Sequence, residues 1–254
     1  MAVLCTFLER VWPEDRKQPV WRADSRLDLA YFLLRILLSG TLAFLTAVVG
    51  LSMPQHDSGG WISRQPIWLQ VLGVLVLTDL ATYWIHRWQH VWKPLWPIHA
   101  IHHSPEKIDW LVAARTHPAE LILQKAGAAI PVYLLGFPPE LFAAIMPAVA
   151  TYSLLLHANL TWSYGPLGYL VASPAFHRWH HSRETEALDK NFSQVFSVFD
   201  FIFRTAYFPR GRTSQSYGLL RDDMPRNLVG QLLYPFRKRQ PARPIVEAHQ
   251  EAQA

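Results

Sequence analysis

Two long apolar segments constrain the fold of this chain more than any other feature of its sequence. Residues 31–53 contain one charged side chain, Arg35, and residues 67–85 contain one, Asp79. A helix needs about 20 residues to cross the hydrocarbon core of a bilayer, and both segments have that length. We therefore expect both segments to be membrane-spanning helices.

Two further apolar segments follow along the chain. Residues 118–135 carry Glu120 and Lys125, whereas residues 141–156 carry no charge but contain Pro147. Each could instead be a buried helix of a soluble protein, or the two could form a re-entrant hairpin. We predict that they form a second pair of membrane helices, which gives about four spans in an all-α bundle.

The placement of Lys and Arg predicts that both chain ends are cytoplasmic. Five precede the first span, one lies in residues 55–66, four lie between the second and third spans, none lies in residues 136–140, and twelve follow the fourth span. Cytoplasmic segments of membrane proteins carry an excess of Lys and Arg, and these counts alternate accordingly. The net charge of +5 therefore requires no nucleic-acid partner.

Composition and local pattern limit the class of protein further. The 11 Trp, 13 Phe and 9 Tyr exclude a disordered chain, and the single cysteine, Cys5, excludes a disulfide scaffold. The first 30 residues lack the apolar core of a cleavable signal peptide, so we expect the first span to direct insertion. We treat residues 1–254 as one membrane-embedded domain with a cytoplasmic N-terminal segment, 1–26, and a flexible tail, 241–254.

Ten of the twelve histidines lie between residues 86 and 181, and most of them form short boxes. The boxes are His86 and His90 (HxxxH), His99, His102 and His103 (HxxHH), and His177, His180 and His181 (HxxHH), with His117 and His157 standing singly. Residues three and four apart share one face of a helix, and neutral imidazole binds iron, zinc, copper or nickel. Ten such ligands predict two metal ions close together, in a cap just above the membrane surface.

The chemistry of this site is narrowed by the motifs that the sequence lacks. It contains no HExxH of zinc proteases, no GxSxG of serine hydrolases and no ExxH of soluble di-iron bundles. A metal site at a membrane surface favours an apolar substrate that arrives laterally from the bilayer. Because C–H bonds offer no leaving group, oxidation by metal-activated dioxygen suits such a substrate better than hydrolysis.

Longer motifs surround the boxes between about residues 79 and 207: DLATYWIHRWQH, LWPIHAIHHSPE, AARTHP, HANL, SPAFHRWHHSR, DKNF and FDFIF. Together they resemble the fatty acid hydroxylase/sterol desaturase superfamily of membrane di-iron enzymes. The resemblance implies two iron ions as cofactor, with O2 as co-substrate. It also implies metal ligands at the eight box histidines and at His157. His117 is a further candidate, which could complete the ligand set, bind substrate or only cap a helix.

The resemblance also draws attention to residues around the ligands. Asp79 lies two helical turns before His86 and could orient a ligand imidazole, or else contact Lys125. Asn191 could support a ligand, and we expect Asp200 to be structural. The chain departs from the family pattern at four positions, where the family often has Tyr, Gly, Trp and Gly: Phe192, Ser193, Phe199 and Arg204.

The sequence thus predicts an integral membrane oxygenase that hydroxylates a lipid C–H bond of a fatty acyl chain, a sterol or a related lipid. A desaturase or a C–C cleaving oxidase on the same site is the enzymatic alternative. A membrane metal-binding or transport protein is the non-enzymatic alternative, although transport would need ligands near the bilayer midplane. Zinc could replace iron in purified protein. We expect electrons to come from a separate donor protein.

Overall fold

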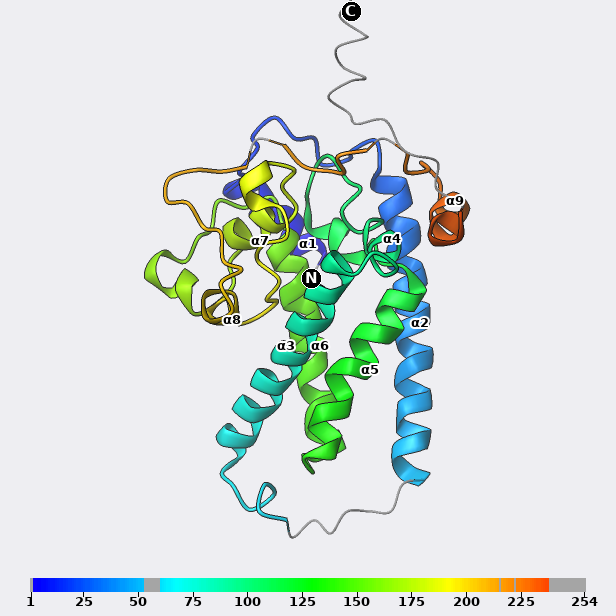
Figure 1. The fold of residues 1–254 in the computed structure, drawn as a ribbon, viewed down its shortest axis with the longest axis vertical. Helices are drawn as coiled ribbons and strands as arrows, with labels where there is room; N and C mark the ends of the chain where they lie inside the picture. The colour runs from blue at the N-terminus through cyan, green and yellow to red at the C-terminus, as the bar shows by residue number, and fades with distance from the viewer. Residues whose placement is uncertain (1, 53–59, 215, 222, 238–254) are drawn as a thin grey trace, which may run out of the picture.

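The computed structural model in Figure 1 describes residues 2–52, 60–214, 216–221 and 223–237. Four long helices extend from a cap of short helices toward the same end of the molecule (Figure 1): α2 (Ser25–Ser52), α3 (Ile67–Val91), α5 (Pro118–Leu134) and α6 (Pro139–His157). The cap contains α1 (Ala2–Val11), α4 (Trp96–His99), α7 (Pro174–His180), α8 (Val198–Ile202) and α9 (Leu228–Leu233). Four 3₁₀ helices complete it: η1 (Trp110–Ala114), η2 (Gly165–Tyr169), η3 (Thr185–Ala187) and η4 (Tyr234–Phe236).

The all-α fold class is confirmed for the described part of the chain. β pairing there is limited to a single antiparallel bridge between Ser182 and Tyr217. The four long helices coincide with the four apolar segments of the sequence. Met53, at the end of the first segment, and the tail 241–254 lie outside the described residues.

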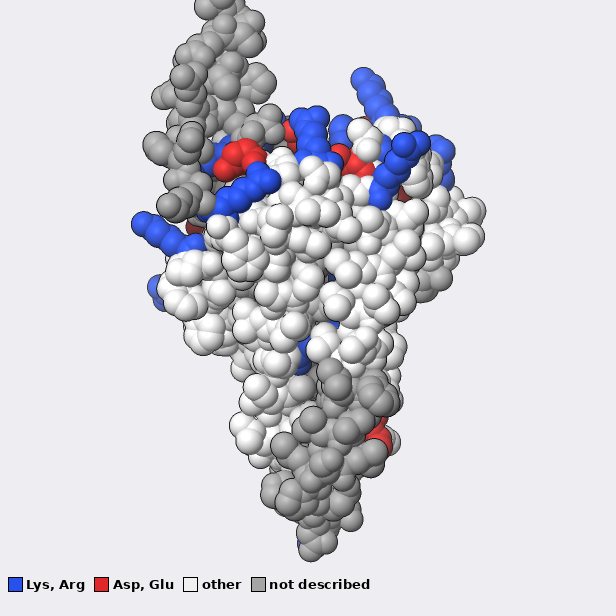
Figure 2. Space-filling view, turned by 90° about the vertical axis from the view of Figure 1, so that its right-hand side faces the viewer, with Lys and Arg blue, Asp and Glu red and all other residues white. Residues whose placement is uncertain are grey.

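The long helices expose their apolar side chains. α3 and α6 are long and apolar enough to cross a membrane, and only 28% and 11% of their most apolar stretches are buried. In α2 and α5, Leu37 and Leu134 are 68% and 79% exposed. Figure 2 shows that Lys and Arg gather at the wide end of the molecule, above a largely uncharged surface. So large an exposed apolar surface is unfavourable in water, but it is the surface that a membrane protein presents to lipid.

The third and fourth apolar segments form two complete helices joined by a tight turn. α5 begins with Pro118 at its first position, where a missing N–H costs nothing. Pro131 and Pro147 lie inside α5 and α6, yet both helices continue through them. Gly136, with φ +80°, allows the turn between them because glycine adopts left-handed backbone readily.

Arg204, one of the departures from the family pattern, follows α8 in a strained backbone conformation. Its φ is 59°, in the left-handed region that favours glycine, and its side chain is exposed. A non-glycine residue there costs about 1–2 kcal/mol, partly offset by the extra freedom that glycine gives the unfolded chain. We expect Arg204→Gly to stabilise the protein by about 0.5–1 kcal/mol.

Thermal unfolding in detergent measures this effect as a rise in Tm of a few degrees. Arg16→Gly is the matched control, because Arg16 is also exposed but lies outside the left-handed region. Equal shifts in the two variants would show that Arg204 is not strained.

Candidate metal centre

Nine of the ten predicted histidines converge in two adjoining groups. Within each group the potential ligand atoms lie within 4.8 Å of one another. The first group consists of His86, His90, His99, His103 and His180, and the second of His102, His157, His177 and His181. The groups touch: the stacked rings of His103 and His181, one from each group, have centroids 4.6 Å apart.

Each HxxHH box contributes to both groups. In the first box, His99 and His103 join the first group while His102 joins the second. Helical geometry explains this split, because residues i and i+4 differ by about 40° around the axis, whereas i+3 points about 100° away from i+4. The second box splits in the same way but with the groups exchanged: His177 and His181 join the second group, and His180 the first.

The outward ring nitrogens of these histidines are held by the protein backbone at four positions. The Nδ1 atoms of His86, His102, His157 and His180 lie 2.8, 3.2, 2.7 and 2.7 Å from the carbonyl oxygens of Phe192, Arg115, Ser153 and Lys190. A carbonyl oxygen only accepts hydrogen bonds, so each Nδ1 must carry the proton. The Nε2 atom of each ring therefore presents an unprotonated lone pair to the interior of its group.

These lone pairs face one another at short range. The Nε2 atoms of His157 and His102 lie 3.1 Å apart. The Nε2 atom of His86 lies 3.0 Å from that of His99, whose Nδ1 faces a carboxylate. Two unprotonated nitrogens cannot form a hydrogen bond, so a cation is what satisfies both. The donor set thus fits a metal ion in each group, of a kind that accepts imidazole.

The electrostatics of the cap keep these rings in the neutral form that binds metals. Burial, followed by repulsion from neighbouring imidazoles, holds the pKa values of His99, His102 and His103 well below their usual range. The same causes lower the pKa values of His177 and His180. Neutral imidazole is the ligand form, and metal binding then requires no loss of protons.

Two carboxylates also contact the ligand rings. Glu120, buried at the start of α5, places Oε1 2.7 Å from His99 Nδ1. Asp189, whose side chain is 61% exposed, lies 3.1 Å from His90 Nδ1. The sequence alone did not predict this role for either residue. A carboxylate within an apolar segment was a signal for Glu120, and Asp189 is the first residue of the DKNF motif. Neither signal shows which ring the carboxylate contacts, because that depends on how distant segments pack.

Replacing Glu120 with Gln is expected to weaken metal binding by the first group by about 10–100-fold. The neutral amide oxygen is a poorer acceptor for the Nδ1 proton of His99, so the ring is less firmly oriented. Metal retention against a competing chelator measures the effect. Glu140→Gln is the control, because Glu140 is exposed in the first turn of α6, at the other end of α5 from Glu120. Equal retention in both variants would contradict the role of Glu120.

The hydrogen-bond partners of Asp79 are neither an imidazole nor Lys125. Its carboxylate accepts the backbone N–H groups of Gln194, Val195 and Phe196, at 3.1, 2.9 and 2.7 Å. Asp200 accepts the N–H groups of Phe192 and Ser193, both at 2.8 Å. The two carboxylates therefore hold the loop 192–196, which also carries the Phe192 carbonyl that faces His86.

Asn191 likewise acts through the backbone. It has a left-handed backbone, with φ 60°, and its side chain donates to the carbonyls of Phe176 and Tyr207 and accepts the N–H of Tyr207. The carbonyls on either side of it, those of Lys190 and Phe192, face His180 and His86. Asn191 thus fixes the peptide that orients two ligands of the first group.

His117 lies outside both groups, at the start of α5. Its Nδ1 accepts the N–H of Ala119 at 3.1 Å, and its Nε2 lies 3.2 Å from the carbonyl of Leu232. Both ring nitrogens are thus engaged by the backbone. This placement matches the helix-cap alternative for His117.

The fold and the site together define a class: an all-α membrane protein with two adjoining histidine groups of the kind that binds metal ions. The fatty acid hydroxylase family model matches residues 71–205, more than half of the chain, and the chain belongs to this family. It is therefore an oxidoreductase of the lipid hydroxylase and desaturase type.

Curated relatives extend the match beyond the histidine boxes. The ornithine lipid hydroxylase OlsE of Rhizobium tropici is 28% identical over 246 residues, 94% of this chain and 74% of that protein. The alkylglycerol monooxygenase of Danio rerio is 33% identical over 148 residues, which are 57% of this chain and 31% of that protein. Methylsterol monooxygenase 1-3 of Arabidopsis thaliana is 28% identical over 56% of this chain and 50% of its own length. No solved structure matches.

Proposed function

We propose that this chain is a di-iron oxygenase that uses O2 to hydroxylate a C–H bond of a membrane lipid. The observation that carries the proposal is the pair of adjoining histidine groups, with five and four imidazoles. Iron ions bound there would supply dioxygen activation, the redox chemistry that oxidation of a C–H bond needs. Zinc also accepts imidazole but has no redox chemistry, so it does not suit the reactions of this family.

The proposed topology has four spans, α2, α3, α5 and α6, with both chain ends and the cap in the cytoplasm. The gathering of basic side chains at the wide end supports this orientation (Figure 2). His86 and His90 lie in the last turns of α3, and His157 ends α6. The site therefore lies where the spans enter the cap, within reach of a lipid that moves in laterally. A transport path would instead need ligands distributed through the spans.

The residues of the chain have distinct roles in this proposal. The nine imidazoles hold the metals. In six of them, backbone carbonyls or the carboxylates of Glu120 and Asp189 hold the proton on Nδ1, which keeps Nε2 free to bind. Because seven of the nine histidines are buried, and the side chain of His90 is only 4% exposed, the cap also limits the access of water to the site.

The substrate class is proposed from the relative that covers nearly the whole chain. OlsE is an ornithine lipid hydroxylase, so we propose an amphiphilic lipid with a polar head group, and ornithine lipid as the first to test. A separate electron-donor protein would supply reducing equivalents.

Comparative lipid analysis tests the function. Cells that make ornithine lipid would express the wild type or His180→Ala under isotopically labelled O2. A lipid that gains one labelled oxygen atom only with the wild type supports hydroxylation. A lipid that loses two hydrogens instead would identify a desaturase. Bound metal without any oxidised lipid, across several hosts and reductants, would favour the metal-binding alternative.

A further inference from the structure

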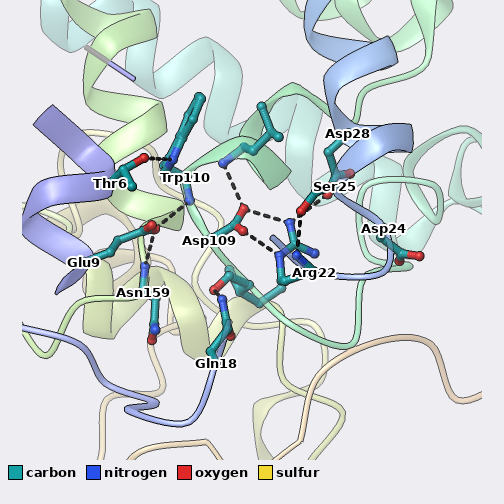
Figure 3. A network of polar contacts seen from close by, with 12 residues as sticks. Thr6, Glu9, Gln18, Arg22, Asp24, Ser25, Asp28, Asp109, Trp110 and Asn159 are labelled. Carbon is teal, nitrogen blue, oxygen red and sulfur yellow. Dashed lines mark hydrogen bonds and ion pairs between the residues drawn. The ribbon is translucent and has the colours of Figure 1, made fainter. Parts of the chain in front are cut away.

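The N-terminal segment 2–28 precedes the region matched by the family model, yet it is joined to the metal centre by buried polar contacts. Figure 3 shows α1 and the start of α2 on either side of the residues that begin η1. The residues that begin η1 follow shortly after the first HxxHH box. The contacts form two links, and each ends beside a histidine of the second group.

The first link runs from Asp28 through Arg115 to His102. Asp28 accepts the Arg115 Nε–H at 2.5 Å, and both side chains are almost completely buried. The backbone carbonyl of Arg115 in turn faces His102 Nδ1 at 3.2 Å. The carboxylate thus fixes the arginine whose carbonyl orients a ligand of the second group.

Arg22 braces this link from the side. Its guanidinium donates to Asp109 at 2.5 and 2.7 Å and to Asp28 at 2.7 Å. Asp109 also caps η1 by accepting the N–H of Leu111 at 3.0 Å. The buried charges therefore alternate in sign from Asp109 through Arg22 and Asp28 to Arg115. Two of these pairs, Arg22 with Asp109 and Asp28 with Arg115, join residues 87 positions apart in the sequence.

The second link joins Glu14 to Arg178, the residue that follows His177 in α7. Glu14 forms an ion pair with the Arg178 guanidinium, which is also almost completely buried. Arg178 donates to the carbonyl of Ile108 at 3.2 Å, and Gln18 donates to the same carbonyl at 2.9 Å. The segment therefore reaches the second HxxHH box as well as the first.

The direct partners of the rings lie outside the N-terminal segment in both groups, and the groups differ in whether that segment holds those partners or a neighbouring residue. In the first group, His99 and His90 contact Glu120 and Asp189, and His86 and His180 contact the carbonyls of Phe192 and Lys190. None of these four partners belongs to the N-terminal segment. Both links from that segment end on or beside His102 and His177, which belong to the second group. Arg115 also donates to Ser104 beside His103 of the first group, at 3.2 Å, but the Ser104 hydroxyl donates to the carbonyl of Ile101 and not to a ring.

We propose that segment 2–28 is an N-terminal strap that positions the ligands of the second group, with Asp28 and Glu14 as its positioning residues. The proposal rests on the proposed function, in which each group holds one metal ion. Loss of a strap contact lowers the affinity of the second metal selectively. A strap that only stabilised the fold would affect both metals alike.

Titration with Co²⁺ tests the strap, because each bound ion contributes to the visible spectrum. Full-length protein in detergent, stripped of metal, is compared as wild type and Asp28→Asn. We expect the wild type to bind two equivalents. In Asp28→Asn the first equivalent should bind as in the wild type, and the affinity for the second should fall by about 10–100-fold.

Asp24→Asn is the matched control. Asp24 pairs with the same Arg115, at 3.3 Å, but its side chain is 38% exposed, so its contribution is small. We expect Asp24→Asn to bind both equivalents as the wild type does, and Asp28→Glu to recover part of the lost affinity. Glu14→Gln provides an independent second variant, with the same direction of effect as Asp28→Asn.

The possible outcomes separate the strap from the function on which it rests. A wild type that binds fewer than two equivalents contradicts the two-metal site itself. If the wild type binds two, equal weakening of both equivalents in Asp28→Asn and Glu14→Gln, or no weakening in either, contradicts only the strap. Failure of both variants to fold also contradicts it, because the segment would then serve general stability.

Discussion

His102→Ala and His180→Ala are each expected to remove metal from the protein and to abolish turnover. His102 is one of four histidines in the second group, and His180 is one of five in the first. Loss of either removes one imidazole ligand from its group, so the metal ion is held by fewer Nε2 lone pairs. Because changes that only orient a ligand already cost about 10–100-fold in metal affinity or activity, loss of the ligand itself should cost more.

Metal analysis of purified protein, together with the yield of oxidised lipid, measures both effects. His117→Ala is the matched control, because it removes another histidine of the same region that lies outside both groups. We expect it to retain two metals and to lose only about 1 kcal/mol of stability through the lost helix cap. A His102 or His180 variant with full iron and full turnover would show that the ligand assignment is wrong.

The parts of this molecule that the sequence predicted are those that depend on local spacing. Apolar stretches of about 20 residues predict α2 and α3 because span length follows from the 1.5 Å rise of a helix. The i, i+3 and i+4 spacing likewise predicts that His99, His102 and His103 are close together. These inferences need no knowledge of how distant segments pack.

The division of ligands between the two groups could not be predicted in this way. It depends on where α4 and α7 lie relative to α3 and α6, which bring His86, His90 and His157 to different groups. Asp79 illustrates the same limit. Its position two turns before His86 predicts a shared helix face, but its actual partners are backbone groups 115–117 residues away.

Asp79→Asn is expected to release the loop 192–196 and to weaken the first metal group. One oxygen of Asp79 accepts the N–H groups of Gln194 and Val195, and the other accepts that of Phe196. In the amide, an NH2 replaces one oxygen and opposes a backbone donor. Hydrogen bonds to charged groups contribute about 1.5–3 kcal/mol each, so a destabilisation of about 3 kcal/mol is expected.

The effect should reach the metal because the same loop carries the carbonyl that orients His86, 2.8 Å from its Nδ1. We expect faster hydrogen exchange in residues 192–196, together with a fall of about 10–100-fold in the affinity of the first group. Thr82→Ala is the control, since Thr82 lies one turn further along α3 and bonds only to carbonyls of its own helix. Unchanged exchange and unchanged metal affinity in Asp79→Asn would mean that the loop is held by Asp200 alone, and that the Asp79 carboxylate does not act on the site.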